Sequence, residues 1–292
     1  PSAEAVRNPV AGMLHRRPVR VICVTSGKGG VGKTNITVNL ALALSLQNQS
    51  VMVLDADMGM ANVDVILGLH PPYNLSHVID QERTLEEVII TGPNGIRIIP
   101  ASSGIKRMAE LTPEENAGLV NAFSELNDSL DIMLIDSAAG IADSVVTLGR
   151  ASHDVVVVVC DEPASITDAY ALIKLMSQEY SVNRFHILAN RVATAQEGRD
   201  LFAKLVKVSD RFLDVILDFC GTIPEDAQLR KAVQAQRAVV EAFPSSRSAE
   251  AFHRLATQVI GRWPIPRTAS GYLQFFIERM ITSADSPEER VE

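Results

Sequence analysis

Unbroken runs of valine, isoleucine, leucine and other apolar residues recur along the chain, and each run is short enough to be one strand. They fall at 20–25, 51–55, 96–99, 131–136, 154–160, 185–190 and, more briefly, 219–223. A strand with one face in water alternates apolar and polar residues, whereas an unbroken run is typical of a parallel strand covered on both faces. The runs therefore predict the strands of a buried parallel sheet.

Between these runs, apolar residues recur with the spacing of one helix face. Helices are predicted at about 33–47, 62–67, 84–90, 113–128, 141–151, 165–179, 197–212, 225–235 and 246–262. Alternation of strands and helices implies right-handed crossovers, with ligands bound beyond the carboxyl ends of the strands. We therefore predict an α/β fold, a three-layer sandwich in which helices cover both faces of a mostly parallel, twisted sheet of seven to eight strands.

The two ends of the chain differ from this central pattern. Residues 1–18 lack periodicity and contain three prolines, so we expect a flexible N-terminal tail. Residues 19–263 would form one domain. Prolines end the helical pattern at Trp263-Pro264-Ile265-Pro266. Residues 264–292 would then contain a linker, a short helix at 272–281 and a disordered tail.

The predicted C-terminal helix is amphipathic. Its apolar face contains Leu273, Phe276, Ile277 and Met280. A helix of this length cannot cross a bilayer, but one with a wide apolar face can lie in the membrane interface. The same face could instead cap an apolar groove on the protein's own body, because Arg279 is the only basic residue within the helix. The pattern leaves both alternatives open.

Composition narrows the function classes. The chain has 292 residues, 47% of them hydrophobic, and a net charge of −8. An acidic chain argues against direct nucleic-acid binding, which needs clustered Lys and Arg. Cys23, Cys160 and Cys220 are scattered singly, so neither a zinc site nor a disulfide framework is indicated. With no signal peptide and no run long enough to cross a membrane, we expect a cytoplasmic protein.

A glycine-rich segment between the first strand and the first helix carries the clearest chemistry. It reads Gly27-Lys28-Gly29-Gly30-Val31-Gly32-Lys33-Thr34, followed by Asn35, and fits the P-loop pattern G-x-x-x-x-G-K-[ST]. Such a loop turns its backbone N–H groups toward phosphates at a helix N-terminus. Lys33 would reach the β- and γ-phosphates, and the Thr34 hydroxyl would bind Mg²⁺. The segment predicts ATP or ADP with Mg²⁺ as cofactors.

Acidic residues follow two of the predicted strands. Asp55 and Asp57 stand at the end of one run, where two carboxylates could serve a metal and a water molecule. Asp136 ends the run 131–136, as a Walker B segment requires, and would hold a Mg²⁺-bound water. The simpler alternative for Asp55 and Asp57 is a helix N-cap with a surface acid beside it.

The second lysine of the loop, Lys28, is not needed by an ordinary P-loop. The arrangement K-G-G-x-G-K-T at 28–34 resembles the deviant Walker A ATPases, the MinD/ParA group. The resemblance implies an ATP-bound homodimer in which Lys28 crosses the interface and stabilises phosphate charge on the partner's nucleotide. The alternative is a solvated loop lysine.

Two further segments resemble the switches of this group. Residues 55–64 match the switch I pattern D-x-D-x-G-x-x-N, which implies that Asp57 orients the attacking water and that Asp55 lies near the Mg²⁺ hydration shell. Ser137-Ala138-Ala139-Gly140 resembles switch II, although many relatives have proline where this chain has Ala138. The detailed geometry of that loop stays open.

Base recognition is expected from later loops. The resemblance implies that Asn190, at the end of the strand before Arg191, hydrogen-bonds adenine. It also implies that the loop Ile223-Pro224-Glu225 lines the adenine pocket with its backbone. The lack of an N-K-x-D guanine motif favours ATP over GTP.

Within the group, several stretches resemble the flagellar-number regulators called FleN or FlhG. These stretches are residues 161–171, 196–199, 231–233 and 241–244. The resemblance implies a slow switch that dimerises with ATP, binds the flagellar activator FleQ and works with the polar-flagellum GTPase FlhF. It also implies reversible membrane docking through the C-terminal helix, at the inner membrane of the cell pole. A MinD-type division-site ATPase, or a P-loop metabolic ligase, remains an alternative function.

Overall fold

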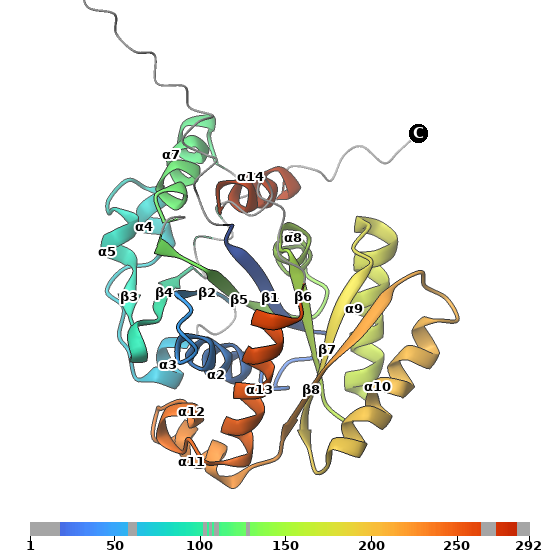
Figure 1. Ribbon diagram of the computed structural model, residues 1–292. Coiled ribbons are helices and arrows are strands. Elements are labelled where there is room, and N and C mark those ends of the chain that lie inside the picture. The colour runs from blue at the N-terminus through green and yellow to red at the C-terminus, as the bar shows by residue number, and fades with distance from the viewer. Residues whose placement is uncertain are drawn as a thin grey trace, which may run out of the picture.

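The protein is built around one twisted sheet (Figure 1). The computed structural model describes residues 18–57, 63–101, 104, 107, 111–126, 129–263 and 273–284. The strand order is β3-β4-β2-β5-β1-β6-β7-β8, and every pair is parallel except β3 with β4. The strands are β1 (Arg20–Ser26), β2 (Val51–Ala56), β3 (Ile90–Thr91), β4 (Arg97–Pro100), β5 (Ile132–Ala139), β6 (Asp154–Val159), β7 (Arg184–Val192) and β8 (Ile216–Pro224).

Helices cover both faces of this sheet, which confirms the predicted three-layer α/β fold. One face packs against α2 (Lys33–Ser45), α3 (Val63–Leu67), α11 (Ala227–Gln234), α12 (Val239–Ala242) and α13 (Arg247–Gly261). The other face is covered by α4 (Leu75–Ile79), α5 (Leu85–Val88), α7 (Pro113–Ser124), α8 (Asp143–Ala151), α9 (Pro163–Tyr180), α10 (Ala195–Ser209) and α14 (Leu273–Ala284). A short 3₁₀ turn, η1 (Pro93–Gly95), connects β3 to β4.

Strand β1 shows why the apolar runs are unbroken. Its residues alternate between the two cores, with Ile22 and Val24 in one and Val21 and Cys23 in the other. All four side chains are fully buried. Because successive side chains of a strand point to opposite faces, a strand covered on both sides needs an apolar residue at every position.

The prediction is wrong in the segment after β2. A helix was expected over 84–90, but α5 ends at Val88 and the chain turns into β3, which pairs antiparallel with β4. Thr84 and Glu87 form a capping box that starts this helix, and Ile89 then adopts extended backbone. The short elements α4 and α12 were also not predicted. The expected N-terminal tail, most of the switch I loop at 58–62 and the linker at 264–272 lie outside the described residues.

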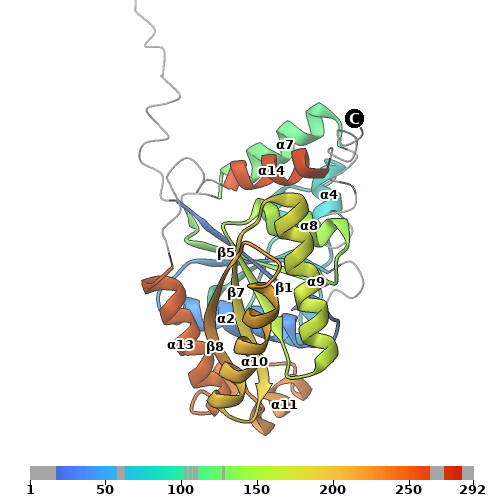
Figure 2. The same cartoon turned by 90° about the vertical axis from the view of Figure 1, so that its right-hand side faces the viewer.

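The C-terminal helix α14 is docked on its own domain. Its apolar face is buried against the core beneath α7 and α8, and Figure 2 shows it lying beside α7. The buried residues are Leu273, Phe276, Ile277, Met280 and Ile281. The Arg279 guanidinium also donates to the carbonyl oxygen of Arg150 at the end of α8, at 2.7 Å. The structure thus shows the helix as a cap on an apolar groove. No helix in the described part of the chain is long and apolar enough to cross a membrane.

Candidate functional site

The P-loop lies between β1 and α2, and close packing explains two of its glycines. Gly32 is the N-cap of α2 with φ +96°, a left-handed conformation that favours glycine. A Cβ on Gly27 would lie 2.1 Å from the backbone carbonyl carbon of Asp168 on α9. Any side chain at Gly27 would therefore push the loop away from α9. Lys33 is the first residue of α2 and is almost completely buried.

A cavity of about 770 Å³ opens beside this loop. Its lining residues are Gly29, Gly30, Gly32, Lys33, Thr34, Asn35, Asp57, Ile66, Ala138, Ala139, Ala142, Ser144 and Arg191. Two of them carry a buried side-chain oxygen that has no hydrogen-bond partner among the described residues, Asn35 Oδ1 and Ser144 Oγ. Buried polar groups are normally paired, so these oxygens mark a cavity shaped for a polar ligand.

Two carboxyl groups are buried side by side at the ends of the central strands. Asp55 on β2 and Asp136 on β5 are register partners, and both are almost inaccessible to water. Asp55 Oδ2 accepts a hydrogen bond from the Val63 amide at 3.2 Å. Burial and the neighbouring Asp136 charge raise the pKa of Asp55 to about 7. Burial likewise raises the pKa of Asp136 to about 6, against the lowering effect of its hydrogen bond with Thr34.

The environment of these two acids fits a magnesium ion. Asp55 Oδ1 and Asp136 Oδ2 are buried without a hydrogen-bond partner in the part of the chain that is described. Mg²⁺ usually binds through one or two carboxylates and the phosphates of a nucleotide, and keeps several waters. Thr37 donates to the other oxygen of Asp136 at 3.2 Å, and the Thr34 hydroxyl, which lies close enough to lower the pKa of Asp136, is the third group available. A divalent cation here would neutralise the acid pair that the fold buries, so the predicted metal residues Thr34, Asp55 and Asp136 do come together.

Lys28 is not among the residues that line the nucleotide cavity, and its side chain pairs with an acid outside the loop. Its Nζ lies 2.7 Å from Glu162 Oε2, and both side chains are substantially exposed. Glu162 is the N-cap residue of α9, directly after β6. The Lys28 ammonium lowers the pKa of Glu162, and Glu162 in turn raises the pKa of Lys28. The signature lysine is therefore neither a free loop lysine nor bound in its own nucleotide cavity.

The residues predicted for base recognition lie at the ends of β7 and β8. Asn190 is buried, and its Nδ2 donates to the Val31 carbonyl of the P-loop at 2.6 Å, while its Oδ1 has no hydrogen-bond partner in the described chain. Arg191 has φ +56° and lines the large cavity. Ile223 is buried, Pro224 pairs with Val192, and Glu225 is exposed beside Arg230. Contact of these residues with adenine stays a prediction.

Sequence reasoning did not single out two residues of this site. Glu162 is 134 positions from Lys28, and nothing in a linear pattern pairs an isolated acid with a distant lysine. Ser144 follows switch II in the first turn of α8, where a small polar residue usually only caps a helix. The one available signal for Glu162 was its place next to a strand end, where parallel α/β folds gather functional groups.

The raised pKa of Asp55 gives a test in protein without nucleotide or metal. The folded state keeps the Asp55 proton up to about pH 7, whereas the unfolded state releases it near its ordinary pKa of 3.8. The contribution of protonated Asp55 to the free energy of unfolding is therefore fully present below pH 4, and it is lost as the pH rises to 7. In wild type the free energy of unfolding should fall by roughly 2 kcal/mol between pH 5 and pH 8 because of this carboxyl, and Asp55→Asn should remove that fall.

This dependence is measured by urea unfolding in EDTA at several pH values. Asp210→Asn, on the exposed end of α10, is the matched control and should leave the curve unchanged. Parallel curves for wild type and Asp55→Asn would contradict the assignment of a raised pKa to this carboxyl.

Comparison with known proteins agrees with this geometry. The family profile described as "ParA: NUBPL iron-transfer P-loop NTPase" matches residues 18–260. The chain is 55% identical to the antiactivator FleN of Pseudomonas aeruginosa over 92% of this chain and 95% of that protein. It is 31% identical to the flagellum site-determining protein YlxH of Helicobacter pylori, over 94% of both chains.

Solved structures give the same result for the fold. MinD in the MinC:MinD cell division complex of Aquifex aeolicus superposes with a TM-score of 0.66 and 27% identity, over 85% of this chain and 99% of that chain. MinD from Pyrococcus horikoshii, solved with Mg-ADP, gives 0.65 and 24% identity, over 83% and 96%. The P-loop, the buried acid pair and these matches together show that the chain belongs to the MinD/ParA family of P-loop ATPases.

Proposed function

We propose that this protein is an ATP-dependent dimerising switch that restrains flagellar number at the cell pole. It would bind a flagellar transcriptional activator of the FleQ type, cooperate with a polar-flagellum GTPase of the FlhF type and dock reversibly on the inner membrane. Its similarity to a protein named as an antiactivator supports the regulatory part. The observation that carries the switch is Lys28, which lies outside its own nucleotide cavity and is held by Glu162.

The residues of the cavity support slow ATP hydrolysis. Lys33 and the P-loop amides would hold the phosphates, and Thr34 with Asp136 would hold Mg²⁺, which neutralises phosphate charge. Asp57 lines the same cavity and would orient a water molecule in line with the bond to the leaving ADP oxygen. The water oxygen would attack the γ-phosphorus as the bond to the ADP oxygen breaks, which gives ADP, inorganic phosphate and a proton released to solvent.

Dimerisation would require Lys28 to exchange one anionic partner for another. An exposed ion pair holds its side chains weakly, because water screens it and both side chains lose freedom. The phosphates of a nucleotide on a second subunit offer a larger negative charge in a less hydrated interface. The ion pair with Glu162 would therefore hold Lys28 in the monomer, but it would be weak enough for Lys28 to bind the partner's nucleotide when a dimer forms.

Helix α8 offers a physical link between the nucleotide and the C-terminal helix. It begins directly after switch II, and Ser144 in its first turn lines the nucleotide cavity. Its other end receives the Arg279 hydrogen bond of α14, and α14 packs along it. A shift of α8 when switch II senses the γ-phosphate would loosen α14, whose apolar face is suited to a membrane interface.

The dimerisation step is tested with two substitutions of opposite effect. Lys28→Ala should bind ATP but stay monomeric, because the group that crosses the interface is gone. Glu162→Gln should lower the ATP concentration for half-maximal dimerisation by roughly two- to fivefold, since Lys28 is released. Sedimentation velocity across an ATP titration measures both.

Asp161→Asn is the matched control, because it removes the neighbouring exposed ion pair with Lys204 and leaves Lys28 in place. Its titration should coincide with that of wild type. ATP-dependent dimers of Lys28→Ala at the wild-type ATP concentration would rule out the crossing role.

Membrane docking is tested by co-sedimentation with anionic liposomes. Wild type should bind with ATP and remain soluble with ADP, and Ile277→Asp should lose binding while it still dimerises. Glu278→Gln changes an exposed position of the same helix and serves as control. Equal binding with ATP and ADP would remove the switch, and no binding in either state would leave α14 a permanent cap.

The cellular role is tested by counting flagella per pole, by electron microscopy, in cells that lack this protein. We expect several flagella at a pole, restored to the normal number by the wild-type gene and not by Lys33→Ala. Normal flagellation accompanied by minicells would instead assign the same ATPase to division-site placement. No change in either would reopen the metabolic ligase.

A further inference from the structure

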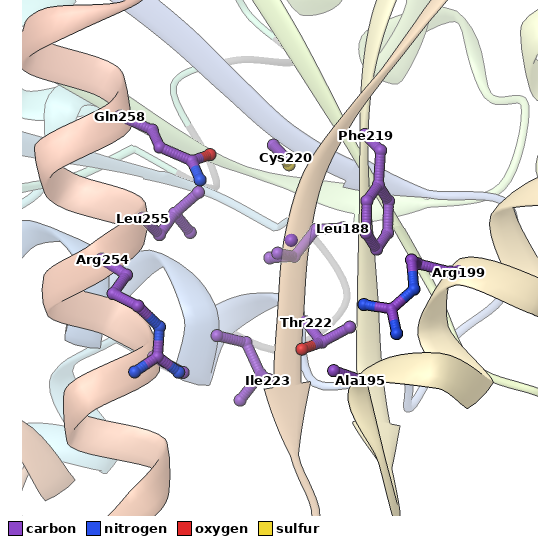
Figure 3. Close-up of a pocket in the computed structure, with 12 residues that line it drawn as sticks. Leu188, Ala195, Arg199, Phe219, Cys220, Thr222, Ile223, Arg254, Leu255 and Gln258 are labelled. Carbon is purple, nitrogen blue, oxygen red and sulfur yellow. The ribbon is translucent and has the colours of Figure 1, made fainter.

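The last strand of the sheet has an unpaired edge. Among the described residues, β8 ends the strand order and forms strand hydrogen bonds with β7 alone. Helix α10 packs on one face of the sheet beside it and α13 on the other, and Figure 3 shows β8 running between these two helices. An uncovered edge presents backbone donors and acceptors that another extended segment can pair with.

A groove follows this edge. Two cavities of about 230 Å³ and 180 Å³ adjoin along it and share Ala195, Thr222 and Arg254. We call them together the β8 edge groove, lined by Ala195, Arg199, Phe219, Thr222, Arg254 and Gln258. The cavity beside the P-loop is lined by other residues, but Ile223 and Pro224, which are predicted to line the adenine pocket, also line these two cavities.

The edge is interrupted within the groove. A bulge at Cys220 shifts the register with β7, and Gly221 adopts φ +125° there. A second register shift follows between Asn190 and Val192 of β7, opposite Ile223 and Pro224. Parallel pairing between the two shifts covers Gly221, Thr222 and Ile223. Because bulges can protect an edge from further pairing, a partner segment would pair with this short stretch alone.

Arginines stand on both sides of this segment. Figure 3 shows Arg199 on the α10 side and Arg254 on the α13 side, and Arg247 lines the adjoining cavity. Arg199 donates twice to the amide oxygen of Gln196, at 3.1 and 2.7 Å. Arg254 lies 3.8 Å from Glu250, an exposed acid that also lines the groove. Three guanidiniums and one carboxylate line the groove, and Asp226 lies beside Arg247, which leaves a small local excess of positive charge in a chain of net charge −8.

Exposed apolar residues gather on the same elements. Of the seven large apolar side chains that are exposed in the described part of the chain, four lie on β8 or on the elements next to it in the sequence or the fold. They are Val208 on α10, Phe212 in the loop after it, Ile216 at the start of β8 and Ile260 on α13, and none of them lines the groove.

We propose that the β8 edge groove binds an extended, acidic segment of a partner protein, which pairs with β8 as a ninth strand. Main-chain hydrogen bonds would give such a segment its affinity. Because successive side chains of a strand point to opposite faces, acidic residues at adjacent positions would meet Arg199 on one side and Arg254 on the other. The site requires neither nucleotide nor dimer, so it stands or fails independently of the proposed switch.

The test uses a display library of random twelve-residue peptides, selected on the full chain without nucleotide. Peptides enriched on wild type should be rich in Asp and Glu and poor in Pro. By fluorescence anisotropy they should bind Arg199→Glu/Arg254→Glu at least about tenfold more weakly. The matched control, Lys174→Glu/Lys231→Glu, changes the net charge equally on exposed faces of α9 and α11 and should bind as wild type does.

Hydrogen exchange of the backbone amides gives a second measurement that does not depend on any variant folding. An enriched peptide should slow exchange within β8, and its N-methylated form, which cannot complete the ladder, should not. The proposal is overturned if no peptide is enriched, if enriched peptides lack acidic residues or bind the double arginine variant equally, or if β8 exchange is unchanged. A nucleotide-independent dimer disrupted by Ile216→Lys would also overturn it, because a second copy would then occupy the edge.

Discussion

The fold buries Asp55 and Asp136 next to each other, and much of the site follows from that constraint. Two carboxyl groups in register on adjacent central strands repel one another when ionised, and burial adds to the cost. In the described part of the chain one oxygen of each has no hydrogen-bond partner, and both pKa values are raised toward neutrality. A divalent cation held by a nucleotide phosphate would relieve this repulsion. The unfavourable interaction of the two carboxylates at the ends of β2 and β5 would then favour the binding of Mg²⁺ with nucleotide.

The same strand ends organise the remaining groups. The P-loop packs against α9 at Gly27, and Glu162, the N-cap residue of α9, forms an ion pair with Lys28. Asn190, from the next strand, holds the Val31 carbonyl and so fixes the loop from the other side. The loop thus contacts α9 on one side and β7 on the other, while Lys28 pairs with an exposed acid. In the proposed switch, these contacts would hold the phosphate-binding backbone in place while Lys28 changes partner.

The features of the site that depend on residues close together in the sequence could be predicted, whereas contacts between distant residues could not. The P-loop, Asp55 and Asp136 are local patterns at strand ends, and the strands themselves are readable because both faces of the sheet are buried. The short elements α4, α12 and β3 were missed because two to five residues carry too little periodicity to distinguish a helix turn or a short strand from a loop. The Lys28–Glu162 pair and the Asn190–Val31 bond join residues more than a hundred positions apart, so only tertiary structure could reveal them.

Helix α14 shows a different limit, because its sequence is compatible with two environments. An apolar face of five residues is equally satisfied by a protein groove or a membrane interface, since both remove it from water. Each buried side chain contributes about 1.5–3 kcal/mol as an upper bound, so undocking into water would be strongly unfavourable. Exchange between groove and membrane is different, because most of that free energy is recovered at the other surface. The balance is then set by smaller terms, such as the Arg279 hydrogen bond to α8 and the pairing of two helices in a dimer. If α14 exchanges with a membrane as proposed, a modest shift of α8 at the nucleotide cavity would be enough to change where the helix lies.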